Sequence, residues 1–150
     1  MAQNTNPIFT LTGRVGWSNN DGGVTGATGP LKTQNTAKDG TGTNPYALPV
    51  FTAKAIDGSF VQRIRFRSAG TNAATVARVF INDGDDQTLA VNNVLYDEIT
   101  LAATTLSEVS ALATYELPLN FVLPAGYKIL VTLGTTVAAG YYVSVIGGDY

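Results

Sequence analysis

The sequence contains no cysteine and no histidine. Without cysteine the chain has no disulfides, no thiolate chemistry and no zinc–sulfur sites, and it fits synthesis in a reducing cytoplasm. Without histidine it lacks the commonest general base and metal ligand. Ser-His and Cys-His catalytic pairs are therefore excluded, and neither G-x-S-x-G nor G-x-x-x-x-G-K-[ST] occurs. We expect a protein that is not an enzyme and binds no cofactor.

Charged residues are also scarce. They make up 13% of the chain, against about 25% in a typical soluble domain. Uncharged polar residues must therefore cover much of the surface, which is typical of a β-rich protein that meets other protein surfaces. The net charge of −2 gives no general affinity for nucleic acid or anionic membranes. No stretch approaches the roughly 20 apolar residues of a membrane span, and MAQNTNPIF does not read as a secretory signal.

The chain does have alternation of apolar and polar residues with a period of two, interrupted by turn residues. This pattern predicts a single domain over residues 1–150 with eight strands. We place them at 8–17, 47–53, 59–68, 75–82, 94–102, 112–120, 127–134 and 141–147. The segment 104–113, TTLSEVSALA, has apolar residues at helical spacing. It is either one turn of helix or an irregular loop.

Two regions lack the alternation: a polar N-terminal arm at 1–6 and a Gly/Asn/Thr-rich insertion at 18–46. A structureless loop of that length is uncommon in a compact domain, so the insertion is either mobile or ordered by something outside the chain. Short strands with turns between them predict an all-β antiparallel β-sandwich, a jelly roll of about eight strands. The rival is an immunoglobulin-like sandwich, for whose buried tryptophan Trp17 comes too early.

The stretch QRIRFR at 62–67 is the strongest candidate for a binding surface. In an extended strand its two apolar side chains face one way and its three basic side chains face the other. This arginine row is Arg63, Arg65 and Arg67. It either faces water or meets carboxylates of a partner, for which the planar guanidinium group is suited. We interpret it as a partner contact.

Several later strands carry apolar side chains on both faces. A sandwich strand needs cover on one face only, so the outer face needs a second cover. Either the insertion or a neighbouring chain supplies it, and we favour the neighbour. The predicted partner or subunit interface therefore combines the arginine row with further outward-facing side chains: Arg63, Arg65, Arg67, Arg78, Phe80, Leu130 and Tyr142.

Other candidate chemistry is weaker. Asp97 and Glu98 are adjacent, so in a strand they face opposite sides and cannot flank one glycosidic bond. Glu98 and Glu116 are the remaining pair, and we interpret them as solvated or paired with arginine. NDGDD at 82–86 concentrates oxygen ligands but does not fit an EF-hand loop. We favour a turn over a weak calcium site.

Three blocks of the sequence resemble a family of small tailed-phage virion proteins. They are RIRFRSAGTNAATVARVFINDG (63–84), NNVLYDEITLAATTLS (92–107) and ELPLNFVLPAGYKILVTLGTTVAAGYYVSVIGGDY (116–150). The opening NPIFT at 6–10 is similar too, and LPAGYKILVTLGT is the most distinctive part. The likeness covers roughly 6–17 and 50–150 and leaves the insertion out. We identify the family as capsid decoration, or cement, proteins with a jelly-roll fold.

The resemblance implies a mechanical function in the virion. Copies, as homotrimers, would bind the major capsid protein on the outer head surface, bridge capsomers and resist the pressure of packaged DNA. The protein would be made in the host bacterial cytoplasm, and the arm at 1–6 would reach an adjacent copy. Similar blocks occur in phage fibre heads. The alternative is therefore a receptor- or glycan-binding head in the phage tail, with Trp17, Tyr46 and Tyr96 as its aromatic platforms.

Overall fold

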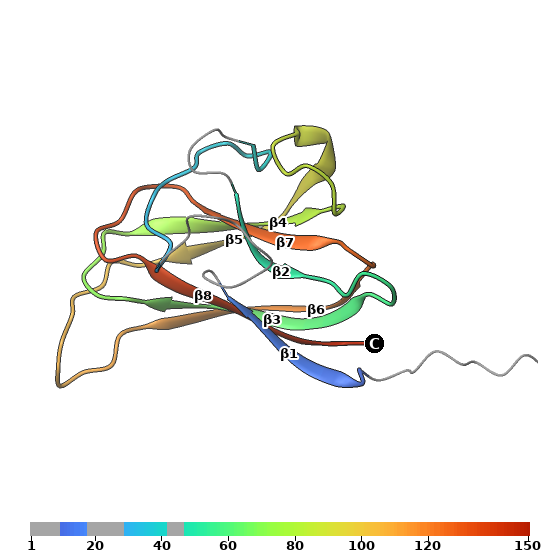
Figure 1. Ribbon diagram of the computed structural model, residues 1–150. Coiled ribbons are helices and arrows are strands. Elements are labelled where there is room, and N and C mark those ends of the chain that lie inside the picture. The colour runs from blue at the N-terminus through green and yellow to red at the C-terminus, as the bar shows by residue number, and fades with distance from the viewer. Residues whose placement is uncertain (1–9, 18–28, 42–46) are drawn as a thin grey trace, which may run out of the picture.

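Eight strands form two antiparallel four-stranded sheets that pack face to face as a β-sandwich (Figure 1). The computed structural model describes residues 10–17, 29–41 and 47–150. The elements are β1 (Thr12–Trp17), β2 (Leu48–Thr52), β3 (Ser59–Ser68), β4 (Thr75–Asn82), the short 3-10 helix η1 (Ala90–Asn92), β5 (Asn93–Leu101), β6 (Thr114–Leu123), β7 (Lys128–Leu133) and β8 (Tyr141–Asp149). The predicted all-β sandwich of eight strands is confirmed.

The two sheets have the strand orders β1-β8-β3-β6, here called sheet A, and β2-β7-β4-β5, called sheet B. The chain changes sheet at each connection except the one between β4 and β5, which are neighbours in sheet B. Apart from β4 and β5, neighbouring strands of one sheet therefore come from distant parts of the sequence. The core lies between the sheets and is lined by the alternating inward side chains that the sequence pattern indicates.

The alternation of β3 contains one irregularity that shapes its outer face. Val61 and Ile64 are both fully buried although three residues apart. The pairing of β3 with both neighbours shifts register between Val61 and Arg63, so two successive residues, Gln62 and Arg63, stay out of the core. On the neighbouring β6, Asn120 takes a left-handed backbone with φ 51°. β-Bulges of this kind redirect side chains.

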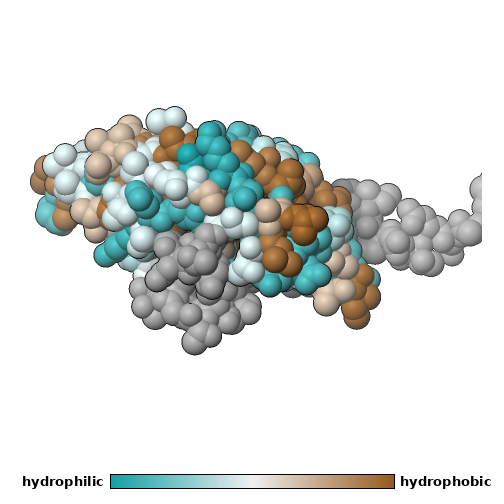
Figure 2. All heavy atoms as spheres, turned by 90° about the horizontal axis from the view of Figure 1, so that it is seen from above, coloured by the Kyte–Doolittle hydropathy of each residue, from teal (hydrophilic) through white to brown (hydrophobic). Residues whose placement is uncertain are grey.

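The outer face of sheet B is covered by the same chain. The segment 29–41 pairs with the end of β7, where the N–H of Asn35 donates to the carbonyl of Leu133 at 2.8 Å. It then passes above sheet B (Figure 1), and Gly40 lies against the side chain of Asn93. A second cluster of fully buried residues forms under this cover, comprising Ala47, Phe80 and Leu130 with half-buried Leu95. Figure 2 looks onto this covered side, where hydrophobic groups are scattered among hydrophilic ones.

This cover corrects one expectation. Phe80 and Leu130 point outward from sheet B, as predicted, but both are 0% exposed within the single chain. No neighbouring copy is needed to shield them, because the chain returns over its own sheet. The described part of the insertion, 29–41, is likewise held by hydrogen bonds to strands of the same chain, at Leu133 and Tyr141. Residues 18–28 and 42–46 lie outside the described residues.

A network of polar groups around Asn72 fixes this covering segment at one end of the sandwich. The side chain of Asn72 donates to Ser68 Oγ and to the carbonyl of Gly140, both at 2.9 Å. Its Oδ1 accepts from the N–H groups of Ala139 and Gly140 at 2.8 Å. Gly140 has φ +87°, and a Cβ there would lie 2.8 Å from the carbonyl oxygen of Leu31. The loops after β3 and β7 are thereby tied to the start of the covering segment.

The segment 104–113 is irregular, so of the two alternatives for it the loop is confirmed. Thr104 pairs with Asn72, and the N–H of Leu106 donates to Thr71 Oγ1 at 3.0 Å. Those two contacts hold the loop in a non-helical path. Within the described ranges, no helix is long and apolar enough to cross a membrane.

Candidate interaction surface

The predicted arginine row lies on the outer face of sheet A, on β3. Its central member, Arg65, stands opposite Glu116 of β6. Arg65 Nε donates to Glu116 Oε1 at 2.7 Å, and its Nη2 bonds to the same oxygen. The hydrogen bond from Arg65, aided by the positive charges of Arg65 and Arg63, lowers the pKa of Glu116 below its ordinary value. Glu116 is therefore a carboxylate at neutral pH.

The other two arginines have weaker partners. Arg63 Nε is 3.9 Å from Glu116 Oε2, and this buried nitrogen has no hydrogen-bond acceptor. Arg67 donates to Thr114 Oγ1 at 3.3 Å. The row thus carries three guanidinium groups and is paired with one carboxylate, which leaves a charge of +2 (three minus one) on this part of the face.

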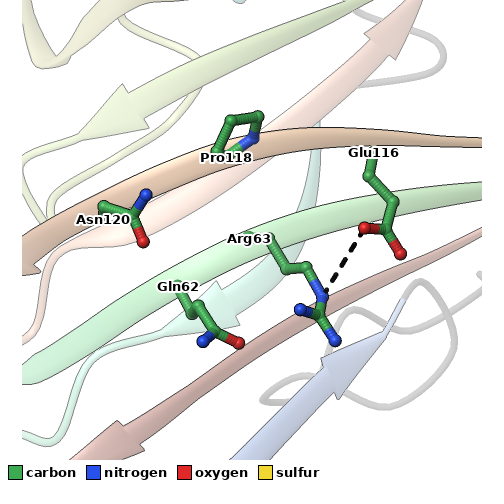
Figure 3. A pocket seen from close by; sticks show the side chains of 5 residues that line it. All are labelled: Gln62, Arg63, Glu116, Pro118 and Asn120. Carbon is green, nitrogen blue, oxygen red and sulfur yellow. Dashed lines mark ion pairs between the residues drawn. The ribbon is translucent and has the colours of Figure 1, made fainter.

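A shallow hollow of about 300 Å³ lies beside Arg63, between β3 and β6 (Figure 3). It lies beside the bulge, where the pairing of β3 with β6 shifts register, and Figure 3 shows Arg63 directed toward Glu116. The lining side chains are Gln62, Arg63, Glu116, Pro118 and Asn120. Two amides and a guanidinium group offer hydrogen-bond donors there. The hollow is chemically suited to a neutral acceptor such as a carbonyl group, because the Glu116 carboxylate also lines it.

Exposed apolar side chains surround the row on the same face. Val15 and Trp17 of β1 are 52% and 42% exposed, Tyr142 of β8 is 51% exposed and Val122 of β6 is 57% exposed. We call the three arginines together with these four side chains the arginine face. Arginine and aromatic residues are enriched at protein–protein interfaces, whereas a purely solvated sheet face does not need exposed tryptophan and valine. The composition of this face is similar to that of protein–protein interfaces.

The structure divides the seven predicted interface residues between the two sheets. Four of them belong to the arginine face: Arg63, Arg65, Arg67 and Tyr142. The remaining three are on sheet B. Phe80 and Leu130 are buried there, and Arg78 Nε donates to Glu98 Oε1 at 2.7 Å, with the Arg78 side chain only 13% exposed. These three are therefore not part of the same surface.

The seven predicted interface residues include Tyr142 but not the other members of this face: Val15, Trp17, Val122 and the paired carboxylate Glu116. A signal for Val15 and Trp17 was present, because they alternate with Arg14 and Gly16 in the first strand. Glu116 was expected to be solvated or paired with arginine, but the sequence did not identify which arginine. It is distant in sequence from Arg65, and only the pairing of β3 with β6 brings the two together.

The other candidate sites do not assemble. Glu98 and Glu116 lie on the outer faces of different sheets, so they cannot act on one bond. The segment 82–86 is a turn whose side-chain oxygens accept hydrogen bonds from its own backbone N–H groups. In the part of the chain that the structure describes, no three His, Cys, Asp or Glu side chains are grouped to hold a metal ion. Tyr96 packs edge-on against Phe121, with ring centroids 5.1 Å apart.

No protein family, curated protein or solved structure matches this chain. The resemblance to phage virion proteins stays a prediction.

Proposed function

We propose that this protein is a non-enzymatic structural protein of a tailed-phage virion, a capsid decoration protein on the outer surface of the head. In this proposal it binds the major capsid protein and stabilises contacts between capsomers. The observation that carries the proposal is the difference between the two outer faces. The chain covers sheet B with its own residues and leaves sheet A open, with arginine, tryptophan and tyrosine on it.

We further propose that the sandwich is a jelly roll. The strand pairs are nested: β1 with β8, β2 with β7, β3 with β6 and β4 with β5. Such nesting is what results when one long eight-stranded hairpin folds over itself into two sheets, as in a jelly roll. A sandwich of this kind presents the outer face of a four-stranded sheet, which suits a protein that lies on a shell.

The arginine face supplies a means of attachment, either to the shell itself or to a neighbouring copy on it. A stable interface covers roughly 800 Å² on each partner, which is the scale of a sheet face. The exposed apolar side chains around the row would exclude water from the arginines on docking. In that environment, removing one partner of a hydrogen-bonded charge pair costs about 2–5 kcal/mol, whereas an exposed pair contributes at most about 1 kcal/mol.

The test is the variant Arg65→Ala, added as purified protein to phage heads that lack their decoration protein and followed by co-sedimentation over a salt series. The control is Lys38→Ala, which removes the same charge from the segment that covers sheet B. We expect Arg65→Ala to bind more weakly with the β-fold intact by circular dichroism, and Lys38→Ala to bind normally. Unchanged binding of Arg65→Ala at every salt concentration would contradict the role of the row. Attachment to host cells but not to heads would contradict the decoration function and support the tail alternative.

A further inference from the structure

The turn between β4 and η1 is acidic and is held by hydrogen bonds within it. It carries the exposed side chains Asp83, Asp85 and Asp86. Each uses Oδ1 to accept a hydrogen bond from a backbone N–H of the turn, at distances of 2.8–3.1 Å. Gly84 has φ +98° and lies so close to the backbone of Gly126 that a Cβ would come within 2.8 Å of that carbonyl oxygen. The turn is therefore held in one conformation. The Oδ2 atoms of the three aspartates take no part in these bonds.

The charge of this turn matches that of the arginine face with the opposite sign. The three aspartates have one cation nearby, Lys128, whose ammonium group donates to the carbonyl of Asp85 at 3.3 Å and whose charge acts on Asp86. Three negative charges and one positive charge give −2 for the turn, against +2 for the arginine row. Six carboxylates of the described residues have no ion pair with a basic side chain, and three of them are in this turn.

The turn also has apolar neighbours. Leu89, Val91 and Val94 follow it in the chain and are 51%, 87% and 58% exposed. Figure 2 shows hydrophobic groups gathering toward the right of the upper surface, the end at which η1 lies in Figure 1. The acidic turn with these three side chains therefore resembles the arginine face in composition. Both combine charged groups with exposed apolar groups, but their charges have opposite signs.

We propose that the acidic turn of one copy docks on the arginine face of a second copy. The inference rests on the proposed function for the use of this face and names its partner. The aspartate carboxylates of the turn would meet the partly exposed guanidinium groups of the arginine row, because Arg63 and Arg65 share a single carboxylate, Glu116. The apolar neighbours of the turn would meet the apolar rim of the face.

The two surfaces are different parts of the molecule, one on sheet A and the other after a strand of sheet B. The contact is either reciprocal within a two-fold dimer or heterologous, with each copy using its turn on one neighbour and its face on another. Heterologous contacts generate closed rings when the rotation between copies closes, and open fibres when it does not.

The experiment measures self-association of the full chain by analytical ultracentrifugation over a range of protein and salt concentrations. The first variant, Asp83→Asn/Asp85→Asn/Asp86→Asn, keeps the oxygen acceptors of the turn and removes its charge. We expect its dissociation constant to rise at least about tenfold, the equivalent of about 1.4 kcal/mol. We expect high salt to weaken the association of the natural chain. Glu108→Gln, in the exposed loop after β5, is the charge control and should leave the constant unchanged.

A charge exchange between the two surfaces makes the test specific. Arg67→Glu, which breaks only the bond to Thr114, should weaken association to a similar extent, and Lys38→Glu should not. Combining Arg67→Glu with Asp85→Lys should restore association to within about threefold of the natural chain if opposite charges meet across the contact. Thermal melting of each variant confirms that the fold is retained.

Three outcomes overturn the inference: a natural chain that stays monomeric at all concentrations, a triple-asparagine variant that associates as tightly as the natural chain, or a charge exchange that restores nothing. A monomer that still binds phage heads would leave the proposed function standing and identify the shell as the occupant of the arginine face. Self-association without binding to heads would support the inference and contradict the proposed function.

Discussion

Replacing Phe80 by alanine tests whether the chain covers its own sheet B. The Phe80 side chain is 0% exposed and packs with Ala47, Leu130 and Leu95. Removing a fully buried phenylalanine from a well-packed site costs about 3–5 kcal/mol, through lost burial and the cavity left behind. We therefore expect Phe80→Ala to lower the free energy of unfolding by that amount, measured by urea denaturation with linear extrapolation.

Tyr142→Ala provides the matched control, because it removes an aromatic side chain from the outer face of the other sheet. Tyr142 is 51% exposed, and we expect its loss to change the free energy of unfolding by less than about 1 kcal/mol. The measurement is made at two protein concentrations about tenfold apart, since cover supplied by a neighbouring copy would make apparent stability concentration-dependent. An effect of Phe80→Ala below about 1 kcal/mol, or one that appears only at high concentration, would refute the self-covered face.

Three further changes test other parts of the structure. Because Arg65 lowers the pKa of Glu116 below its ordinary 4.5, the natural chain should be more stable than Glu116→Gln above about pH 4.5. That difference should fade as the pH falls through the folded-state pKa, and urea denaturation at several pH values will show it. Asn72→Ala leaves the buried N–H of Gly140 and the partly buried N–H of Ala139 without acceptors. We therefore expect the free energy of unfolding to fall by about 2–3 kcal/mol in chemical denaturation, and an unchanged value would contradict the role of this polar network. Gly140→Ala places a Cβ against the Leu31 carbonyl at positive φ and should lower the melting temperature, with a cost of about 2 kcal/mol.

The positions of the strands were predictable because the signals for them are local. The predictions at 59–68 and 75–82 agree with β3 and β4 at both ends, where Gly58 and Gly84 adopt positive φ in the turns. The sixth strand extends three residues past its predicted end at 120. Asn120 is typical of a turn, but here it takes its left-handed conformation inside a strand. The eighth strand extends to Asp149, because Gly147 and Gly148 still pair with β3.

The candidate site was predictable only in part. Local alternation placed Arg63, Arg65 and Arg67 on one face of a strand, and the structure agrees. Alternation also showed that Phe80 and Leu130 point away from the core between the sheets, but not what lies over them. Cover depends on where a distant segment returns, and residues 29–41 have almost no apolar pattern to indicate their path.

By itself, the sequence determined the fold class, the positions of the strands and the side of each strand that enters the core. It could do so because a two-residue period and turn residues act over short distances. The tertiary structure alone decided which strands share a sheet, that Glu116 stands opposite Arg65, and which outer face stays open. Those features depend on contacts between residues far apart in the chain, which no local pattern encodes. The difference between a covered sheet B and an open arginine face on sheet A is therefore a property of the folded molecule.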